Sequence, residues 1–440
     1  MRERIGVLGG GLVGALISIL LVKKGFRVEV FEKRPDPEKN ISTEGRSINL
    51  ALSHRGIRAL TLAGVFEEIE PLLIPMYGRM IHIENNTDFQ SYGRKDQFID
   101  SVSRQQLNAV LIAHAKKSGV TYHFKQPIQK TNPVTGGITL PSGISHHFDF
   151  IIGADGAFSE LRKTIGGLDN TSATTEETLS HGYKELTIPA IDGSYALDPN
   201  VLHIWPRKDY MLIALPNTDK SFTCTLFLAN EGQPSFSRIT SPQQIKDFLE
   251  GSFSDAMKLI PDYVDQFQKN PTSTLQNIKT YPWTYQKALL IGDAAHAIVP
   301  FYGQGMNAGF EDCRILIELL ESNHLNWDKT VTDFQRKRKK DADAIAELAL
   351  QNFLEMRKHV IDEAFLRRKQ LESRLNNAFP DEWLPLYSMV TFSDMPYHEA
   401  LHTGKLQLQA IQSLGNDYNP DNVDLKALID TFKMLAQADR

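Results

Sequence analysis

The order of apolar and polar positions predicts a strand, a glycine-rich turn, a helix and a second strand at the start of the chain. Residues 5–8 form a short apolar run typical of a buried strand, and residues 9–14 contain four glycines. Residues 15–22 are apolar over helical length, and residues 26–32 show the pattern of another strand. The first 32 residues therefore predict one compact unit built around a turn.

The pattern changes further along the chain. Apolar runs at residues 148–152 and 288–291 predict two more buried strands. Residues 183–230 contain alternating strands such as 210–214 and 222–228, which predict a second sheet. From about residue 326 onward the pattern is helical, with charged faces at 335–343 and 367–374. This order predicts an α/β protein with an inserted antiparallel sheet and a helical C-terminal region.

Length and composition restrict the class of protein. A chain of 440 residues predicts about three structural units. The 48 basic and 53 acidic residues give a net charge of -5, which does not favour binding to nucleic acid or to an anionic membrane. The only cysteines are Cys224 and Cys313, so a reducing compartment is expected rather than a secreted disulfide scaffold.

The uncharged run at residues 6–22 has the outline of a signal peptide or a short membrane anchor. Five glycines interrupt that run, and a strand pattern follows it in place of a cleavage site. We therefore expect it to be part of the fold, and we expect the protein to be cytoplasmic.

The glycine-rich turn has the spacing of a dinucleotide-binding site. Gly9 permits the tight turn, Gly11 lets the backbone approach a pyrophosphate, and Gly14 lets the helix lie close to the sheet. The N-terminus of the helix then meets the phosphates. Glu32, 18 residues after Gly14, ends the second strand and can accept hydrogen bonds from both ribose hydroxyls, which favours FAD or NAD over NADP. A ligand-free βαβ unit is the alternative.

Two later motifs distinguish between these cofactors. Asp155 follows a strand within Gly-Ala-Asp-Gly-Ala-Phe-Ser-Glu-Leu-Arg, and Asp293 follows another within Gly-Asp-Ala-Ala-His. These are the second and third motifs after the glycine-rich turn at residues 9–14. After the third motif, a further glycine-rich turn opens a helix at Gly305, Met306 and Asn307. Without the other motifs, the Asp155 segment would be interpreted as an ordinary Asp-Gly turn. Together the motifs resemble those of the flavoprotein aromatic hydroxylases, which implies bound FAD, with Asp293 at its ribityl chain and the helix N-terminus at the flavin N1/C2=O edge.

Within that group, strings outside the flavin motifs resemble the kynurenine 3-monooxygenase family over about residues 4–400. The strings lie at residues 46–53, 103–107, 181–189, 202–207, 222–226, 355–357 and 385–393. We expect His296 to be packed or hydrogen-bonded rather than an acid or base, and we expect no metal site.

The resemblance implies contacts with the substrate residue by residue. The resemblance assigns Arg79 and Tyr92 to the α-carboxylate of the substrate. An arginine fork is the natural bidentate partner of a carboxylate, and a tyrosine hydroxyl adds a donor. Asn352 is a polar amide on an apolar stripe formed with Ile345, Leu348, Met356 and His359, so it should face the interior. The alternative for Arg79 is a solvated surface charge. The alternative for Asn352 is an amide that bonds only to a neighbouring helix. The further implied substrate contacts are Tyr387, Phe301, Gln304 and Met356.

The resemblance also implies the remaining flavin contacts and the reaction. The implied cofactor-binding residues beyond the motifs named above are Val13, Lys33, Arg34, Ala51 and Arg104. NADPH would reduce FAD, dioxygen would add at flavin C4a, and the resulting hydroperoxide would convert L-kynurenine to 3-hydroxykynurenine. No catalytic acid or base is required, because the hydroperoxide is the oxidant. With no second nucleotide fingerprint, NADPH is expected to dock transiently.

The motif order implies a discontinuous, Rossmann-like FAD-binding domain of the aromatic-hydroxylase or glutathione-reductase type. We expect it to comprise residues 1–75, 100–175 and 280–325, with a substrate-binding sheet at 76–99 and 176–279 and a helical region at 326–440. Residues 401–440 contain no apolar run of a length that would span a membrane. Another flavin hydroxylase or epoxidase, and a non-catalytic flavin redox sensor, are the competing interpretations.

Overall fold

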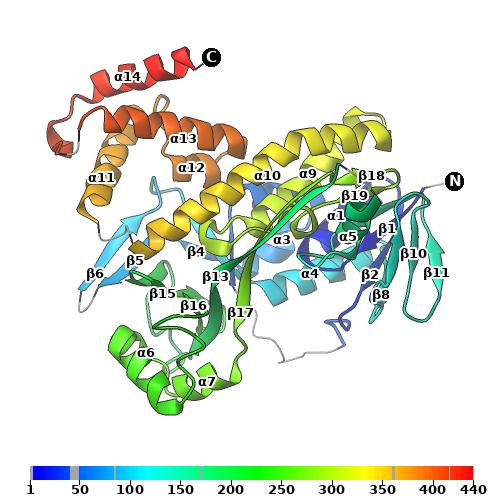
Figure 1. The fold of residues 1–440 in the computed structure, drawn as a ribbon, viewed down its shortest axis with the longest axis horizontal. Helices are drawn as coiled ribbons and strands as arrows, with labels where there is room; N and C mark the ends of the chain where they lie inside the picture. The colour runs from blue at the N-terminus through cyan, green and yellow to red at the C-terminus, as the bar shows by residue number, and fades with distance from the viewer. Residues whose placement is uncertain are drawn as a thin grey trace.

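The computed structural model describes residues 3–39, 49–83, 86–168, 171–358, 362–415 and 417–439. Figure 1 shows a parallel sheet with its helices on the right, a second sheet at the lower left and the C-terminal helices at the upper left. The long helix α10 (Trp327–Lys358) extends across these parts. Residues 46–48 of the first family string and His359 lie outside the described residues.

The first sheet has six strands, and those at its centre are parallel. Its order is β18-β19-β12-β1-β2-β8, and only the edge pair β18–β19 is antiparallel. In that order the strands are Thr284–Tyr285, Ala288–Leu290, Phe150–Gly153, Arg4–Leu8, Arg27–Glu32 and Thr121–Phe124. The central strands are almost completely buried, as expected for a parallel sheet covered on both faces.

This strand order brings the sequence motifs together. Parallel strands end at the same edge of a sheet, so the residues that follow β1, β12 and β19 are neighbours there. Gly9, Asp155 and Asp293 occupy these three positions, and Glu32 ends β2 beside them. The predicted strands at residues 5–8, 26–32 and 148–152 therefore share one sheet.

Helices pack on the first sheet and on one another. α1 contacts α4 and α9, and nine of its twelve residues are buried, so the apolar run near the start of the chain is β1 and α1. No helix in the described part of the chain is both long and apolar enough to cross a membrane. The helices of this part are α1 (Leu12–Lys23), α2 (His54–Ala63), α3 (Phe66–Ile69), η1 (Glu70–Leu72), α4 (Arg104–Lys117), α5 (Glu160–Leu168), α8 (Asp293–His296), η2 (Pro300–Tyr302) and α9 (Gly305–Ser322).

Two small sheets complete this part. One has the order β11-β10-β9, with strands Ser145–His147, Gly137–Thr139 and Lys130–Asn132. The other has the order β3-β7-β4, with strands Asn49–Leu52, Ile99–Ser103 and Ile74–Met76.

The second large sheet has seven strands in the order β17-β13-β16-β15-β14-β5-β6, and all its pairs are antiparallel except β14–β5. In that order the strands are Ser273–Tyr281, Ala173–Ile188, Phe222–Ala229, Tyr210–Pro216, Leu202–Arg207, Gly78–Ile83 and Asn86–Ser91. α6 (Pro242–Met257) and α7 (Tyr263–Lys269) share a core with one face, and α10 shares a core with the other.

The helical C-terminal region predicted from residue 326 is observed. Its shorter helices are α11 (Glu363–Ala378), α12 (Leu386–Thr391), α13 (Tyr397–Gln412), η4 (Pro420–Asn422) and α14 (Leu425–Ala438). α13 contacts α10, α12 and α14, and a small apolar core lies among α11, α13 and α14. α12 and α13 therefore connect the end of the chain to the centre of the molecule (Figure 1).

Candidate active site

The glycine-rich turn is tightly packed on two sides and open on a third. Gly9 has a φ of +98°, and a β-carbon there would lie 2.5 Å from the Ala154 carbonyl oxygen. A β-carbon at Gly14 would lie 1.9 Å from the Gly9 carbonyl oxygen, because α1 packs directly on the turn. At Gly11 a β-carbon would meet nothing within 4 Å. Packing thus requires Gly9 and Gly14, whereas Gly11 borders open space.

The first turn of α1 faces that space. The helix has no side-chain cap and no acidic residue in its first turn, so its N-terminal amides and the positive end of its dipole can meet an anion. Val13 packs its side chain against two glycines of the third motif, since a β-carbon at Gly309 would lie 2.6 Å from Val13 Cγ2 and one at Gly292 would lie 3.1 Å from it. The backbone amide of Val13 is therefore the group that can face a ligand.

Glu32 is held next to the glycine turn. Its Oε2 accepts a hydrogen bond from the Gly10 amide at 2.7 Å, and its Oε1 accepts one from the Arg34 amide at 2.8 Å. The carboxylate is buried, while the side chains of Lys33 and Arg34 are exposed. Each carboxylate oxygen can accept a further hydrogen bond, so the group remains able to bind a diol.

The second motif forms the turn from β12 into α5. One carboxylate oxygen of Asp155 accepts a hydrogen bond from the Glu160 amide at 2.8 Å, and the other is buried without a hydrogen-bond partner among the described residues. Desolvation raises the pKa of Asp155 above its usual value. Ser159 accepts from the Arg162 amide, and the Arg162 guanidinium donates to the Ala294 carbonyl at 3.1 Å. Ser159 and Arg162 therefore stabilise the turn and connect it to the third motif.

The third motif places Asp293 at the start of α8. Its side chain is open to solvent, yet desolvation by the surrounding protein raises its pKa, an effect that the charges of Arg104 and His296 oppose. Arg104 is the first residue of α4 and is itself exposed. His296 is buried, and its Nε2 lies 2.6 Å from Asp312 Oδ2, so it is a hydrogen-bonded residue of the motif, as expected.

Asn307 and Gln304 connect α9 to the β3 strand. The Asn307 amide donates to the Ala51 carbonyl at 2.8 Å and accepts from the Ser53 amide at 3.0 Å. Gln304 donates to the Ser53 hydroxyl at 3.3 Å and accepts from the Tyr397 hydroxyl at 2.9 Å. Both side chains are buried, so Asn307 can offer a ligand its backbone amide rather than its carboxamide.

The start of α9 resembles the start of α1. It has no side-chain cap and no acidic residue in its first turn. Gly305 and Met306 at this turn are only partly buried, so the N-terminal amides of α9 have access to a ligand.

Arg79, Tyr92 and Tyr387, here called the Arg79 cluster, come from β5, the residue after β6, and α12. The guanidinium carbon lies 5.6 Å from the Tyr92 ring centroid and 5.3 Å from that of Tyr387, and the two rings stack at 5.2 Å. Arg79 Nε and the Tyr92 hydroxyl are buried, and the polar groups within reach of Arg79 and Tyr92 include each other and Tyr387. Buried donors of this kind are typical of a site that receives a polar ligand.

Asn352, Phe301 and Met356 adjoin the Arg79 cluster. The Asn352 amide donates to the Phe301 carbonyl at 2.6 Å, and the Phe301 ring stacks on Phe353 at 4.0 Å. Phe301 and Met356 share an apolar core with Tyr92. Asn352 faces the interior, as the apolar stripe predicted, and the wall beside the Arg79 cluster is aromatic.

The residues at the edge of the parallel sheet fit a flavin dinucleotide. The open side of Gly11 leaves room for a pyrophosphate, and the two uncapped helix starts offer amides to anionic groups. The unpartnered oxygen of Asp155 and the open Asp293 can accept hydrogen bonds from hydroxyl groups.

Comparison with known proteins agrees with this geometry. The family model described as FAD binding domain matches residues 3–340. The kynurenine 3-monooxygenase of Flavobacterium johnsoniae is 46% identical over 97% of this chain and 98% of its own. That of Dictyostelium discoideum is 42% identical over 97% and 96%. The chain belongs to the kynurenine 3-monooxygenase family.

Solved structures outside the kynurenine 3-monooxygenase family share the fold. The tetrameric form of 2-methyl-3-hydroxypyridine-5-carboxylic acid oxygenase has a TM-score of 0.69 and 19% identity, over 84% of this chain and 96% of that one. PqsL from P. aeruginosa, in complex with 2-aminobenzoylacetate, has a TM-score of 0.66 and 16% identity, over 81% and 99%. At this identity the likeness shows a flavoprotein oxygenase fold and no more.

Two residues near the Arg79 cluster of this kynurenine 3-monooxygenase family member were not predicted as site residues. Burial lowers the pKa of Arg79, whereas Tyr92, Tyr387 and the charge of Glu355 raise it. Burial raises the pKa of Tyr302, and the charge of Glu355 adds to that effect. Tyr302 is buried, and its ring stacks on Tyr387 at 5.6 Å. Glu355 follows Asn352 by three residues on α10, so helical spacing was the signal that could have found it.

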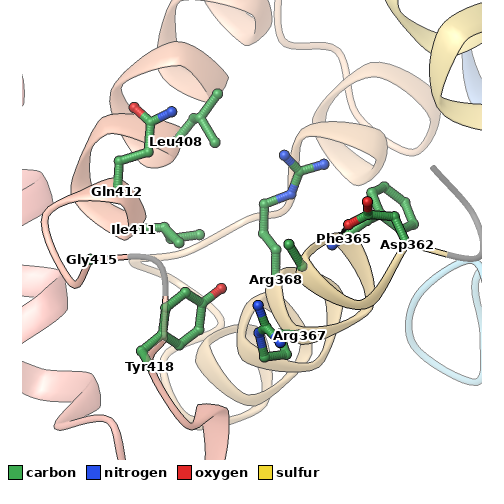
Figure 2. A pocket seen from close by; sticks show the side chains of 10 residues that line it. Asp362, Phe365, Arg367, Arg368, Leu408, Ile411, Gln412, Gly415 and Tyr418 are labelled. Carbon is green, nitrogen blue, oxygen red and sulfur yellow. Dashed lines mark hydrogen bonds between the residues drawn. The ribbon is translucent and has the colours of Figure 1, made fainter.

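A separate cavity of about 260 Å³ lies in the C-terminal region of this kynurenine 3-monooxygenase family member (Figure 2). It lies between α11 and α13 and contains none of the predicted site residues. Its lining residues are Asp362, Ala364, Phe365, Arg367, Arg368, Leu408, Ile411, Gln412, Gly415 and Tyr418.

Proposed function

We propose that this protein is an FAD-dependent monooxygenase that hydroxylates L-kynurenine to 3-hydroxy-L-kynurenine. In the balanced reaction, kynurenine, dioxygen, NADPH and a proton give 3-hydroxykynurenine, NADP⁺ and water. The observation that carries the proposal is the Arg79 cluster, whose buried guanidinium and tyrosine hydroxyls suit a carboxylate, in a chain that is 46% identical to a kynurenine 3-monooxygenase.

In this proposal FAD lies along the carboxyl edge of the parallel sheet. Its pyrophosphate would lie at Gly9, Gly11 and the first turn of α1, and Glu32 would bind the adenosine ribose. Asp155 and Asp293 would bind hydroxyl groups of the cofactor, and the start of α9 would face the flavin ring. The other proposed contacts are Val13, Gly14, Lys33, Arg34, Ala51, Arg104, Gly305, Met306 and Asn307.

The substrate would bind with its amino acid end in the Arg79 cluster. The Arg79 fork and the Tyr92 and Tyr387 hydroxyls would hold the α-carboxylate, while the Glu355 carboxylate would attract the ammonium group. Asn352 would position the polar middle of the substrate. The proposed lining of the aromatic ring is Phe301, Gln304 and Met356.

Bound FAD supplies the redox chemistry that activates dioxygen with electrons from NADPH, which would dock transiently. The chain would orient the kynurenine ring and exclude water. Burial raises the pKa values of Tyr92, Tyr387 and Tyr302, so their hydroxyls are protonated at neutral pH and act as hydrogen-bond donors rather than bases. This is consistent with a reaction in which the amino group on the ring already activates the carbon that is hydroxylated.

Product analysis with purified protein tests the proposal. We expect a yellow protein whose NADPH oxidation is accelerated by L-kynurenine, with 3-hydroxykynurenine formed in proportion to the NADPH consumed. Accelerated oxidation that yields only hydrogen peroxide would contradict the substrate assignment, and purified protein that does not bind FAD would contradict the cofactor assignment. An absence of any substrate-dependent oxidation would favour the redox sensor.

A further inference from the structure

Arg55 lies where the C-terminal helices meet the flavin-binding part of the chain. It is on α2 and only 1% exposed. Its Nε donates to the Val390 carbonyl at 3.1 Å, one terminal nitrogen donates to Glu311 Oε1 at 2.7 Å, and the other donates to the Met395 carbonyl. One guanidinium thus joins two backbone carbonyls of the C-terminal region to a carboxylate of α9.

The ring of Tyr397 packs against the flat face of this guanidinium. Its centroid lies 4.0 Å from the guanidinium carbon of Arg55, which is cation–π contact. The Tyr397 hydroxyl donates to Gln304 Oε1 at 2.9 Å, and Gln304 is the residue that precedes α9. Arg55 and Tyr397, here called the Arg55 joint, therefore fix the start of α13 to the start of α9.

The joint also fixes the position of Tyr387. Val390 and Tyr387 lie on α12, which has only six residues and no side-chain cap. Such a short helix depends on outside contacts for its position. A β-carbon at Gly404 of α13 would lie 2.9 Å from the Leu386 side chain, so α12 packs closely on α13 and is bonded to Arg55 through the Val390 carbonyl.

A buried chain of ion pairs continues from the joint to the third flavin motif. Glu311 Oε2 accepts from Arg338 at 2.8 Å, and Arg338 Nε donates to Asp312 Oδ1 at 2.8 Å. Asp312 Oδ2 in turn accepts from the Gly292 amide at 3.0 Å, next to Asp293. The charges of His296 and Arg338 outweigh the desolvation that opposes them and lower the pKa of Asp312 to about 2, so this carboxylate stays charged.

Resting on the proposed function, we propose that Arg55 and Tyr397 are positioning residues for kynurenine binding. They hold the substrate contacts Tyr387 and Gln304 in a fixed position relative to the turn that carries Asp293. Neither residue touches the substrate in this proposal. Their removal would therefore affect substrate binding and the yield of product per NADPH through Tyr387 and Gln304.

Tyr397→Phe is the first variant to test, because it keeps the ring beneath Arg55 and removes only the hydroxyl bond to Gln304. We expect the KM for kynurenine to rise about threefold or more, with FAD affinity measured on the apoprotein within twofold of the wild type. Tyr263→Phe is the matched control, because it removes a hydroxyl that bonds to exposed Glu250, and it should change neither quantity.

Arg55→Lys keeps the charge and loses the fork, and exposed Arg58 provides its control. Arg58 on the same helix pairs with Asp394, with side chains 42% and 47% exposed. Arg55→Lys should raise the KM about fivefold or more and speed hydrogen exchange at residues 386–392 without substrate, whereas Arg58→Lys should do neither.

Several outcomes distinguish the two proposals. If the wild type does not hydroxylate kynurenine, the proposed function fails, and hydrogen exchange at residues 386–392 still tests the joint. If the wild type is active but Tyr397→Phe leaves the KM and the product yield per NADPH unchanged, the positioning role is overturned. If Arg55→Lys does not fold, the Tyr397→Phe result decides. A lower melting temperature with wild-type KM and hydrogen exchange would show a purely structural role and overturn the proposal.

Discussion

Replacing Arg79 with alanine tests the centre of the proposed substrate site. The guanidinium of Arg79 lies against two tyrosine rings, and the charge of Glu355 acts on it from α10. Its proposed partner is the α-carboxylate of kynurenine. A hydrogen bond to a charged group contributes about 1.5 to 3 kcal/mol, and each 1.4 kcal/mol is about tenfold in affinity. Arg79→Ala should therefore raise the Kd and KM for kynurenine about 10- to 150-fold.

The assay compares kynurenine with its decarboxylated amine, which keeps the ring and the ammonium group. Arg79→Ala should weaken the binding of kynurenine and leave that of the amine nearly unchanged, because the amine has no carboxylate to lose. Arg94→Ala is the matched control, since Arg94 is exposed and lies two residues from Tyr92. FAD content should match the wild type in both variants. Equal weakening of both ligands by Arg79→Ala would refute the assignment of Arg79 to the carboxylate.

Three further predictions concern the glycine-rich turn, Asn352 on α10, and His82 on β5 of the second sheet. Gly11→Ala should fold, because its β-carbon meets no protein atom, but it should bind FAD at least about tenfold more weakly, because the same β-carbon occupies the space proposed for the pyrophosphate. Gly14→Ala should be strongly destabilised, because its β-carbon would lie 1.9 Å from the Gly9 carbonyl oxygen. Wild-type FAD affinity in Gly11→Ala would contradict the cofactor site. Asn352→Leu should cost about 1 to 3 kcal/mol of unfolding free energy, because it leaves the Phe301 carbonyl unpaired, and should also raise the KM for kynurenine; an unchanged KM would leave Asn352 a purely structural amide. Desolvation lowers the pKa of His82 from 6.5 to about 4, so the unfolded chain binds a proton at this residue more readily than the folded chain does. The free energy of unfolding should therefore fall by up to about 3 kcal/mol as the pH falls from 6.5 to 4. Urea titrations of His82→Gln should show a weaker pH dependence over this range.

The parallel sheet and its motifs were predictable from the sequence because their signals are local. Gly9 and Gly14 cannot be replaced without a clash, and Asp155 and Asp293 each follow a short apolar strand. Strand order is not local, so only the structure shows that β19, β12, β1 and β2 are neighbours.

The side chains around the substrate were less predictable. Asn352 was found by helical spacing and faces the interior as expected. The roles of Asn307 and Gln304 were harder to predict, because their carboxamides bond to β3 and α13, which are far away in sequence. Tyr302 depends on the packing of α10 against η2, a contact that no periodicity of the sequence indicates, whereas Glu355 could have been found from its helical spacing to Asn352.

The pairing of β1 with β12 bears on how the chain folds during synthesis. Arg4 donates its amide to Asp149, 145 residues later in the chain. At 5 to 20 residues per second, translation takes on the order of ten seconds to supply this partner, and longer to supply β19. During that time β1 has an open edge, so the nascent N-terminal segment needs protection from association with other chains. The glycine turn is therefore not a separable module, and a fragment that ends before β12 should aggregate rather than bind a nucleotide.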